Sequence, residues 1–441
     1  MKLINISVQK LEKISAYFFL TFIFFLPFMK RKEFYLPDSF WNGNFIEYVT
    51  PSIYVSELFL LVALGIFLLL FILFKEKYIF KSILTRNLTR LFILFQVFSL
   101  VSLFFSQTQI VSLYYILVSW VLFITILYLT YFLRSMSNIR SLTNVFLVAM
   151  TIQGVIAMLQ FITGHSIGLH VIGEQYLSSE TIGVAKVVFG SVKHIRPYGT
   201  FSHPNILGYF TAIAIYLGLN DYISLEGNRR TLRIITLFIL ALTLLLTFSR
   251  ISWIVATIFV VGIYLKKFHK TLHIRNFFKE NTKPLTYLIV FSTLLVGAVM
   301  WYRVNPLNPL TWESLVVRYQ LYIHSLKMLL LYPQGVGIGN YSIILTKTYS
   351  SLPFWMLQPV HNTFLLAINE LGLGLVVLML AALPYAWKKL QKTTYENKLL
   401  ITGLLIFMIF DHAFWDIRQA QYLFVLVIGL CISRIEIGRK T

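Results

Sequence analysis

The segment YVSELFLLVALGIFLLLFILF, residues 54–74, has one charged side chain in a run that is otherwise almost entirely apolar. As a helix it is about 30 Å long, which matches the hydrocarbon layer of a bilayer. The whole chain has a similar character, because 58% of its 441 residues are hydrophobic and only 12% are charged. A soluble surface needs roughly a quarter of residues charged. The sequence therefore predicts a polytopic membrane protein.

Similar apolar runs recur along the chain, and we interpret them as twelve membrane-spanning helices. Their approximate bounds are 14–29, 54–74, 91–105, 110–132, 142–163, 205–219, 234–248, 251–265, 285–301, 362–386, 399–414 and 419–433. The predicted fold class is an all-α helical bundle, with residues 1–441 forming one integral membrane domain. The single cysteine, Cys431, excludes internal disulfides and cysteine-clustered metal sites.

The distribution of Lys and Arg orients these spans, because cytoplasmic loops carry an excess of both. One set of alternate loops holds 26 of the 38 basic residues with 7 acids, and the other set holds 12 basic and 10 acidic residues. The first set is expected to be cytoplasmic, together with both termini. The net charge of +21 is then mainly a topology signal that also favours anionic membrane lipids, and no nucleic-acid partner is predicted.

Three segments are expected on the outer side, namely residues 30–53, 164–204 and 302–361. The third is too long for a simple connection, so we expect it to be structured. Within it, residues 315–331 have the pattern of an apolar helix at the outer membrane face, which Pro333 ends.

Arginines at the outer ends of spans run against the positive-inside bias. Arg250 lies in TFSRISW, residues 247–253, in a turn of almost no length between two apolar segments. A cation there either reaches the interface and fixes the turn or binds an anion such as phosphate. Arg318 lies on the helix of the third outer segment, where solvation and ligand binding are both compatible with the pattern.

The stretch RPYGTFSHPN, residues 196–205, begins with Arg196 and is a fixed loop rather than a helix, because it contains two prolines and a glycine. It places His203 and Asn205 at the mouth of the next span. A structured loop in this position is compatible with a binding site and equally with a re-entrant cap.

His361 is predicted in the first turn of a span at the outer interface, with Asn362 directly after it. A helix start offers free N–H groups and a positive dipole, which suit an anion and favour a neutral imidazole. A structural histidine is the simpler alternative. Glu370 lies about two turns further on a roughly opposite face, where an acid needs a partner or water.

No motif for a metal or a nucleotide accompanies these residues. The outer side has no Asp-x-Asp pair and no His-Glu-x-x-His spacing, and the chain has no Walker sequence. Asp411, His412 and Asp416 cluster at the outer end of a span, but neither a metal nor another cofactor is predicted. ATP-driven transport is not expected for this chain alone.

Three motifs, in order and on the same predicted side, resemble the O-antigen ligase and polymerase superfamily of bacterial membrane enzymes. They are RPYGTFSHPN at 196–205, Ser249-Arg250 followed by Arg318 and YPQGVGIG at 332–339, and His361-Asn362 with Glu370 and Gly372. The first is similar to the family's Arg-x-x-Gly-Thr-Phe-x-x-Pro-Asn, and the third looks like its His-x10-Gly pattern. The resemblance covers most of the chain, including the large loop between the ninth and tenth spans. His203 departs from the pattern and is assigned no role.

The resemblance implies a metal-independent, inverting glycosyltransferase of the GT-C type in the bacterial cytoplasmic (inner) membrane. Its donor would be a glycan on undecaprenyl diphosphate or a related polyprenyl diphosphate. Its acceptor hydroxyl, on a lipid, a glycan or a protein, would attack the anomeric carbon on the extracytoplasmic side. Such enzymes build cell-surface polysaccharides, including lipopolysaccharide.

By motif, Arg250 and Arg318 are expected to bind the diphosphate, because guanidinium groups stay charged and form paired hydrogen bonds with phosphate. His361 is expected to orient or deprotonate the acceptor. Substrate contacts are also expected from four further residues: Arg196, Asn205, Asn362 and Glu370. Arg196 would be a second phosphate or sugar ligand, while Glu370 has the alternative of an internal partner that holds a helix in place.

Several other functions compete with the ligase-like interpretation. A polymerase of lipid-linked repeat units belongs to the same superfamily, and the moderate outer loop without an added soluble domain favours the ligase slightly. A transporter or flippase for lipid-linked oligosaccharides would place charges along a path through the bilayer centre. The polar residues gather instead at the predicted outer interface, which favours chemistry over passage and also over an inactive scaffold.

Overall fold

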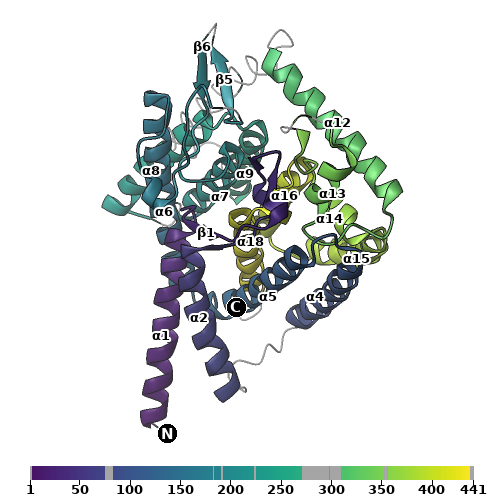
Figure 1. Cartoon of the computed structure of the whole chain (residues 1–441). Coiled ribbons are helices and arrows are strands. Elements are labelled where there is room, and N and C mark those ends of the chain that lie inside the picture. The colour runs from purple at the N-terminus through teal and green to yellow at the C-terminus, as the bar shows by residue number, and fades with distance from the viewer. Residues whose placement is uncertain are drawn as a thin grey trace.

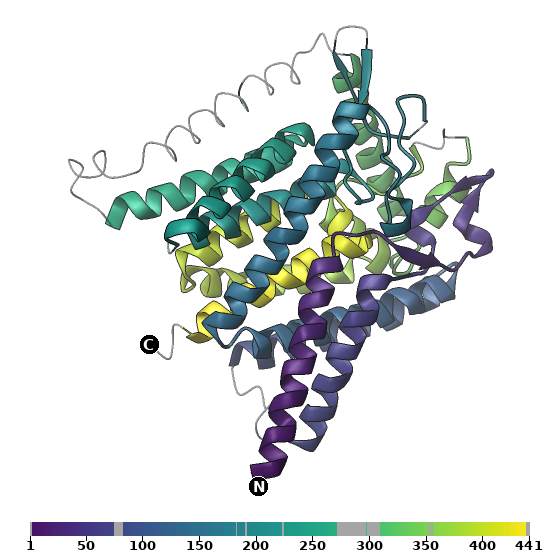
Figure 2. The same cartoon turned by 90° about the vertical axis from the view of Figure 1, so that its left-hand side faces the viewer.

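The computed structural model describes most of the chain and is dominated by helices (Figures 1 and 2). The described residues are 2–74, 83–181, 183–189, 192–222, 225–270, 297, 309–351, 353 and 356–437. Among them, four helices are long and apolar enough to cross a membrane, namely Val55–Leu73, Asn87–Phe105, Gln109–Phe132 and Met136–Thr163. A shorter apolar helix covers Arg418–Ser433. These lengths and compositions are those of a membrane protein.

Within its described residues, the first half of the chain forms five long helices, of which the first, third and fifth begin several residues before the predicted spans. They are α1 (Lys2–Phe25), α2 (Val55–Leu73), α4 (Ile83–Ser102), α5 (Gln109–Phe132) and α6 (Met136–Thr163). Polar residues at the predicted cytoplasmic ends continue these helices beyond the apolar runs. Their backbone N–H and C=O groups still pair within the helix, so leaving the membrane does not end it. The first span was predicted to reach residue 29, but α1 ends at Phe25 because Pro27 cannot continue a helix. Helices α1 and α2 lie side by side in both views (Figures 1 and 2).

The second half contains more and shorter elements. They are α7 (Pro204–Tyr222), α8 (Gly227–Leu246), α9 (Arg250–Lys270), α12 (Pro309–Leu331), α13 (Tyr341–Thr348), α14 (Thr363–Leu371), α15 (Gly374–Gln391), α16 (Tyr395–Phe410), α17 (Ala413–Asp416) and α18 (Arg418–Ile437). The predicted span 285–301 falls almost wholly outside the described residues. Helix α12 contains the predicted 315–331 helix and ends two residues before Pro333.

Two predicted spans need correction because they are interrupted. The predicted span 399–414 ends at Phe410, and residues 411–417 form a separate segment with the short helix α17. The predicted span 362–386 breaks at Gly372, between α14 and α15. The break follows Asn369 and Glu370 and lies between Gly372 and Gly374, within an otherwise apolar run.

The break at Gly372 is produced by contact with the glycine-rich loop of residues 333–337. Gly372 has φ 84° and ψ 174°, a conformation open essentially only to glycine. The loop donates to the end of α14 through Val336 N–H to Asn369 O at 3.0 Å and Gly337 N–H to Glu370 O at 3.0 Å. The YPQGVGIG motif therefore serves to fasten the loop to α14.

Gly372→Ala is expected to destabilise the protein by roughly 2–5 kcal/mol, from backbone strain together with a clash. A Cβ at this position would lie 2.4 Å from Gln334 O, which is backbone and cannot move aside cheaply. Gly43→Ala is the matched control, because Gly43 also has a positive φ but has nothing within 4 Å of its Cβ. Thermal unfolding in detergent measures both, and equal losses of stability would contradict the close-packing account.

Two of the predicted outer segments contain short strands, so the all-α prediction is wrong in detail. Among the described residues, β1 (Arg31–Glu33) pairs with β4 (Ser52–Tyr54), β2 (Phe40–Trp41) with β3 (Asn44–Phe45), and β5 (Lys186–Phe189) with β6 (Val192–Ile195), all antiparallel. These strands have two to four residues, too few to show a clear alternating pattern in the sequence. In Figure 2 they lie away from the marked C-terminus.

Helix α7 forms the centre of the bundle and sets the position of the candidate site. Nearly all of its residues from Ile206 to Leu219 are buried, because α6, α8, α9 and α18 contact it. A helix that is apolar on every side belongs inside a bundle. Its N-terminal turn consequently holds Asn205 and Tyr209 in fixed positions next to the predicted outer loops.

Candidate functional site

The motif loop, residues 196–205, is fixed by two buried glutamines of α6. Gln160 Oε1 accepts the N–H of Gly199 at 2.8 Å, and Gln153 Oε1 accepts the N–H of Thr200 at 2.8 Å. Gly199 has φ 59°, and a Cβ there would lie 2.6 Å from Gln153 Oε1. The glycine of the motif is thus required by a close approach of backbone to side chain.

Arg196 lies inside this frame, with only 8% of its surface exposed. Its Nε donates to Thr247 O at 2.7 Å and its Nη2 donates to Asn205 Oδ1 at 2.8 Å. It therefore joins the motif loop to the turn between α8 and α9 and to the start of α7. Burial lowers the pKa of His203 to about 3, and the charge of Arg196 adds to the effect. The His203 ring is neutral at physiological pH.

Asp411, in the segment between α16 and α17, is the acid at the centre of the cluster. Its carboxylate accepts the hydroxyl of Tyr209 at 2.5 Å, the amide of Asn205 at 3.4 Å and the N–H of Ala413 at 3.1 Å. Burial raises the pKa of Asp411, but His412, His361, the Tyr209 hydroxyl and Arg318 together outweigh this and hold it below the usual value. Asp411 is ionised and is rigidly positioned.

His412 connects this acid to a second one. Its Nδ1 lies 2.8 and 2.9 Å from the two carboxylate oxygens of Asp416, four residues along the chain. Burial lowers the pKa of His412, but Asp416 and Asp411 raise it above the usual value. The ring of Tyr48, from the first outer segment, packs edge-on against His412 with centroids 5.3 Å apart. The predicted outer segment thus closes over the cluster.

His361 lies one residue further from α14 than predicted. The helix is capped by Asn362, whose Oδ1 accepts the N–H of Leu365 at 2.8 Å, so His361 precedes the first turn rather than occupying it. Asn362 Nδ2 also donates to Ile409 O at 3.0 Å. The predicted substrate contact Asn362 therefore has a structural role as a helix cap. The His361 ring packs 5.2 Å from that of His412.

Arg318 lies within electrostatic range of this histidine. Burial lowers the pKa of His361 well below its usual value, and the charge of Arg318 lowers it further against the opposing effect of Asp411. The guanidinium of Arg250, at the first residue of α9, interacts electrostatically with that of Arg318. The structure therefore brings Arg250, Arg318 and His361 into one neighbourhood from three distant parts of the chain.

Arg250 and Arg318 have no acidic partner among the described residues, unlike three nearly buried arginines of the chain. Among the described residues neither guanidinium forms an ion pair or hydrogen bond. Arg31, Arg233 and Arg418, by contrast, pair with Glu47, Asp221 and Glu57. Two like charges near each other in a partly buried setting attract an anion strongly.

Glu370 is used within the fold. Its Oε2 accepts the N–H of Gly339 at 2.7 Å and the indole N–H of Trp415 at 2.6 Å, while Oε1 accepts the N–H of Tyr341 at 3.3 Å. The side chain is 3% exposed. Of the two roles predicted for Glu370, these contacts favour the internal partner, here one that joins the glycine-rich loop to α14 and α17.

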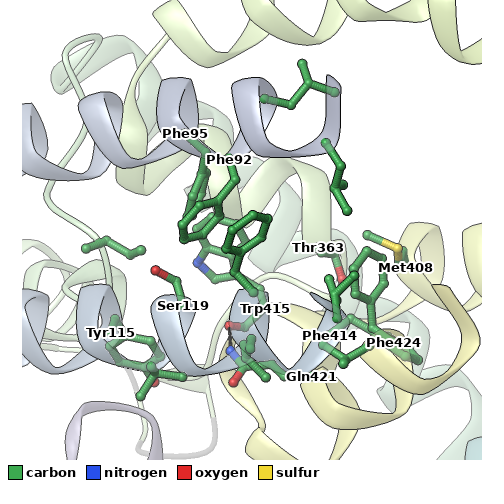
Figure 3. A pocket seen from close by; sticks show the side chains of 18 residues that line it. Phe92, Phe95, Tyr115, Ser119, Thr363, Met408, Phe414, Trp415, Gln421 and Phe424 are labelled. Atoms are coloured by element: carbon green, nitrogen blue, oxygen red, sulfur yellow. Dashed lines mark hydrogen bonds between the residues drawn. The ribbon is translucent and has the colours of Figure 1, made fainter. Parts of the chain in front are cut away.

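An apolar pocket of about 300 Å³ shares a wall with the polar cluster (Figure 3). Side chains of α4, α5, α16 and α18 line it, and Phe92, Phe95 and Trp415 present their rings to it. Thr363 lies on its wall and donates from Oγ1 to Asp411 O at 2.7 Å. An amphiphile with an apolar chain and a polar head fits this juxtaposition.

The structure adds residues that the sequence-based prediction left out of the site. Asp411 and His412 were recognised as a cluster but were given no function, and Tyr209 was not considered. Ionisable residues at the end of an apolar run carry a signal of their own, because they are costly there unless used. His361, Asp411 and His412 each present a donor atom, and the three atoms lie within 4.8 Å of one another. This group has the composition of a metal site.

The chain matches no protein-family model, and comparisons with curated proteins and with solved structures give no significant match. The function is therefore inferred from the geometry of the site.

Proposed function

We propose that this chain is an O-antigen ligase-like glycosyltransferase that moves a glycan from a polyprenyl-diphosphate carrier to an acceptor hydroxyl. The proposal includes a twelve-span, GT-C-like bundle in a bacterial cytoplasmic membrane, with the site on the extracytoplasmic side. The observation that carries it is the approach of Arg250 to Arg318, neither of which has an acidic partner among the described residues. An anion with more than one charge, such as a diphosphate, compensates both.

The surroundings of the arginines support a lipid-linked anion over a soluble one. The apolar pocket shares its wall with the polar cluster through Thr363, so an isoprenoid chain in the pocket brings its head group toward the cluster. Guanidinium groups bind phosphate oxygens through paired hydrogen bonds and keep their charge at every relevant pH. A long apolar chain joined to a diphosphate has the chemistry that this arrangement recognises.

In the proposed reaction, the acceptor oxygen forms a bond to the anomeric carbon as the bond from that carbon to the diphosphate oxygen breaks. The configuration at carbon inverts, and the acceptor proton passes to a base or to water. Negative charge grows on the departing diphosphate, where Arg250 and Arg318 stabilise it electrostatically. His361, neutral because of burial and of Arg318, is suited to orient the hydroxyl or accept its proton.

Arg250→Lys is expected to weaken binding of a short-chain polyprenyl diphosphate by about 10-fold, because an ammonium cannot reproduce the bidentate contact. Equilibrium binding to the purified chain in detergent measures this. Arg229→Lys is the matched control, since Arg229 is exposed on the predicted cytoplasmic side.

The same assay tests the proposed ligand class. The diphosphate should bind more tightly than the monophosphate, and the uncharged prenol only weakly. Equal affinity for the prenol and the diphosphate, or unchanged binding by Arg250→Lys, would show that Arg250 only fixes the turn between α8 and α9.

A further inference from the structure

We propose that His361, Asp411 and His412 form a binding site for a divalent transition-metal ion, with Zn²⁺ as the expected occupant. Their donor atoms lie within 4.8 Å of one another. Tetrahedral Zn²⁺ with ligands at about 2.1 Å holds its donor atoms about 3.4 Å apart, so shifts of about 1 Å complete the site. Two imidazoles and one carboxylate are a donor set that zinc enzymes use.

His412 already has the orientation of a metal ligand. Its Nδ1 pairs with Asp416 at 2.8 Å, and both side chains are nearly buried, with 7% and 6% exposed. The other ring nitrogen, Nε2, lies 4.0 Å from Asp411 Oδ1. Metal-binding histidines characteristically donate their second ring N–H to a carboxylate, which fixes the ring and raises its basicity. Asp416 is placed to do this for His412.

The two other donors are held in place and one of them lacks a partner. His361 Nδ1 is buried and has no hydrogen-bond partner among the residues that the structure describes. Buried polar atoms are normally satisfied, so such an atom calls for an explanation, and a bound metal ion would supply the missing partner. Asp411 is fixed by the hydroxyl of Tyr209 on Oδ2 and by the N–H of Ala413 on Oδ1.

The local charges permit a cation here. Arg318 acts electrostatically on the cluster and opposes a metal ion, while Asp411 and Asp416 offset it. The alternative state of the cluster is an imidazolium at His412 paired with Asp416, in which a proton takes the place of the metal. Metal binding departs from the metal independence that the family resemblance implies, and it does not depend on the proposed glycan transfer.

The test is a Co²⁺ titration of the full chain, purified in detergent without a histidine tag and treated with a chelator beforehand. Co²⁺ in such a site gives a visible absorption band, and we expect one equivalent to bind and Zn²⁺ to displace it. Asp411→Asn should abolish the band. Asp416→Asn, which leaves all three ligands, should weaken Co²⁺ binding by about 10- to 100-fold.

His165→Ala is the control variant, because His165 is an exposed histidine of the second outer segment and should leave the titration unchanged. A band of equal strength in wild type and Asp416→Asn, or no saturable band in wild type, would overturn the metal site. If Asp411→Asn fails to fold, the Co²⁺ affinity of Asp416→Asn still tests whether the metal site exists. Polyprenyl-diphosphate binding, measured with chelator present, should persist through the arginines, so a failed metal site and a failed proposed function are distinguishable.

Discussion

Arg318→Ala is expected to lower the rate of glycan transfer by about 10³-fold, the scale of losing one arginine that stabilises a phosphoryl leaving group. Arg318 is the residue that connects Arg250 to the histidine cluster, because it acts electrostatically on both. Arg318→Lys keeps the positive charge but loses the paired N–H donors of the guanidinium group, so an intermediate rate is expected. Transfer is measured in proteoliposomes with a defined lipid-diphosphate glycan and an acceptor.

The stability of Arg318→Ala separates a binding role from a structural one. Arg318 has no ion pair or hydrogen bond among the described residues, and its charge is repelled by that of Arg250. Its removal should leave the thermal unfolding midpoint unchanged or slightly raised. Residues retained for function often reduce the stability of the folded state, so replacing one need not destabilise the protein. Gln320→Ala, on an exposed position of the same helix, is the control. A variant that loses stability but keeps its rate would contradict the assignment.

His361→Ala is expected to lower the rate of transfer by about 10²- to 10⁴-fold, the usual contribution of a side chain that positions or moves a proton. The imidazole is held neutral at the start of α14, beside Asp411 and His412. Binding of the polyprenyl diphosphate should change little, because the arginines supply it. The expected signature is therefore a large fall in kcat with a small change in the affinity for donor.

His165→Ala provides the matched control for the loss of a histidine on the same predicted side. Purified His361→Ala should retain the helical content of the wild type, since the ring is not fully buried. Normal transfer by this variant would remove His361 from the mechanism. If His361 is also a metal ligand, its contribution is orientation of the acceptor rather than removal of its proton, because one ring nitrogen cannot do both.

The apolar runs predicted the helices well, but they did not predict where helices are interrupted. Residues 362–386 form a largely apolar stretch that contains Asn369 and Glu370, and a glycine in such a stretch is ordinarily tolerated. The interruption at Gly372 arises from backbone hydrogen bonds made by residues 333–337, which are distant in the sequence. A backbone contact between distant segments does not alter the hydrophobic periodicity of the sequence, so the periodicity cannot predict the interruption. The short strands of the predicted outer segments were missed because so few residues take part.

The candidate site was partly predictable for a different reason. Arg250 and Arg318 stand out because the positive-inside bias disfavours cations on the side predicted to be outer. His361 stands out because it is predicted in the first turn of a span at the outer interface. Asp411 and His412 gave a weaker signal, since only the folded chain brings them beside His361. Asn362 and Glu370 were predicted from their motif to contact substrate, yet their hydrogen bonds hold the ends of α14.

Reconstitution of the purified chain into liposomes with a polyprenyl-diphosphate glycan and an acceptor tests the central claim most directly. Mass spectrometry of the products, with leaflet-specific labelling of the donor, distinguishes transfer from passage. The proposed site predicts free polyprenyl diphosphate together with an elongated acceptor, and neither product with Arg318→Ala. Intact donor that appears on the opposite leaflet, without any elongated acceptor, would contradict the account and indicate a flippase.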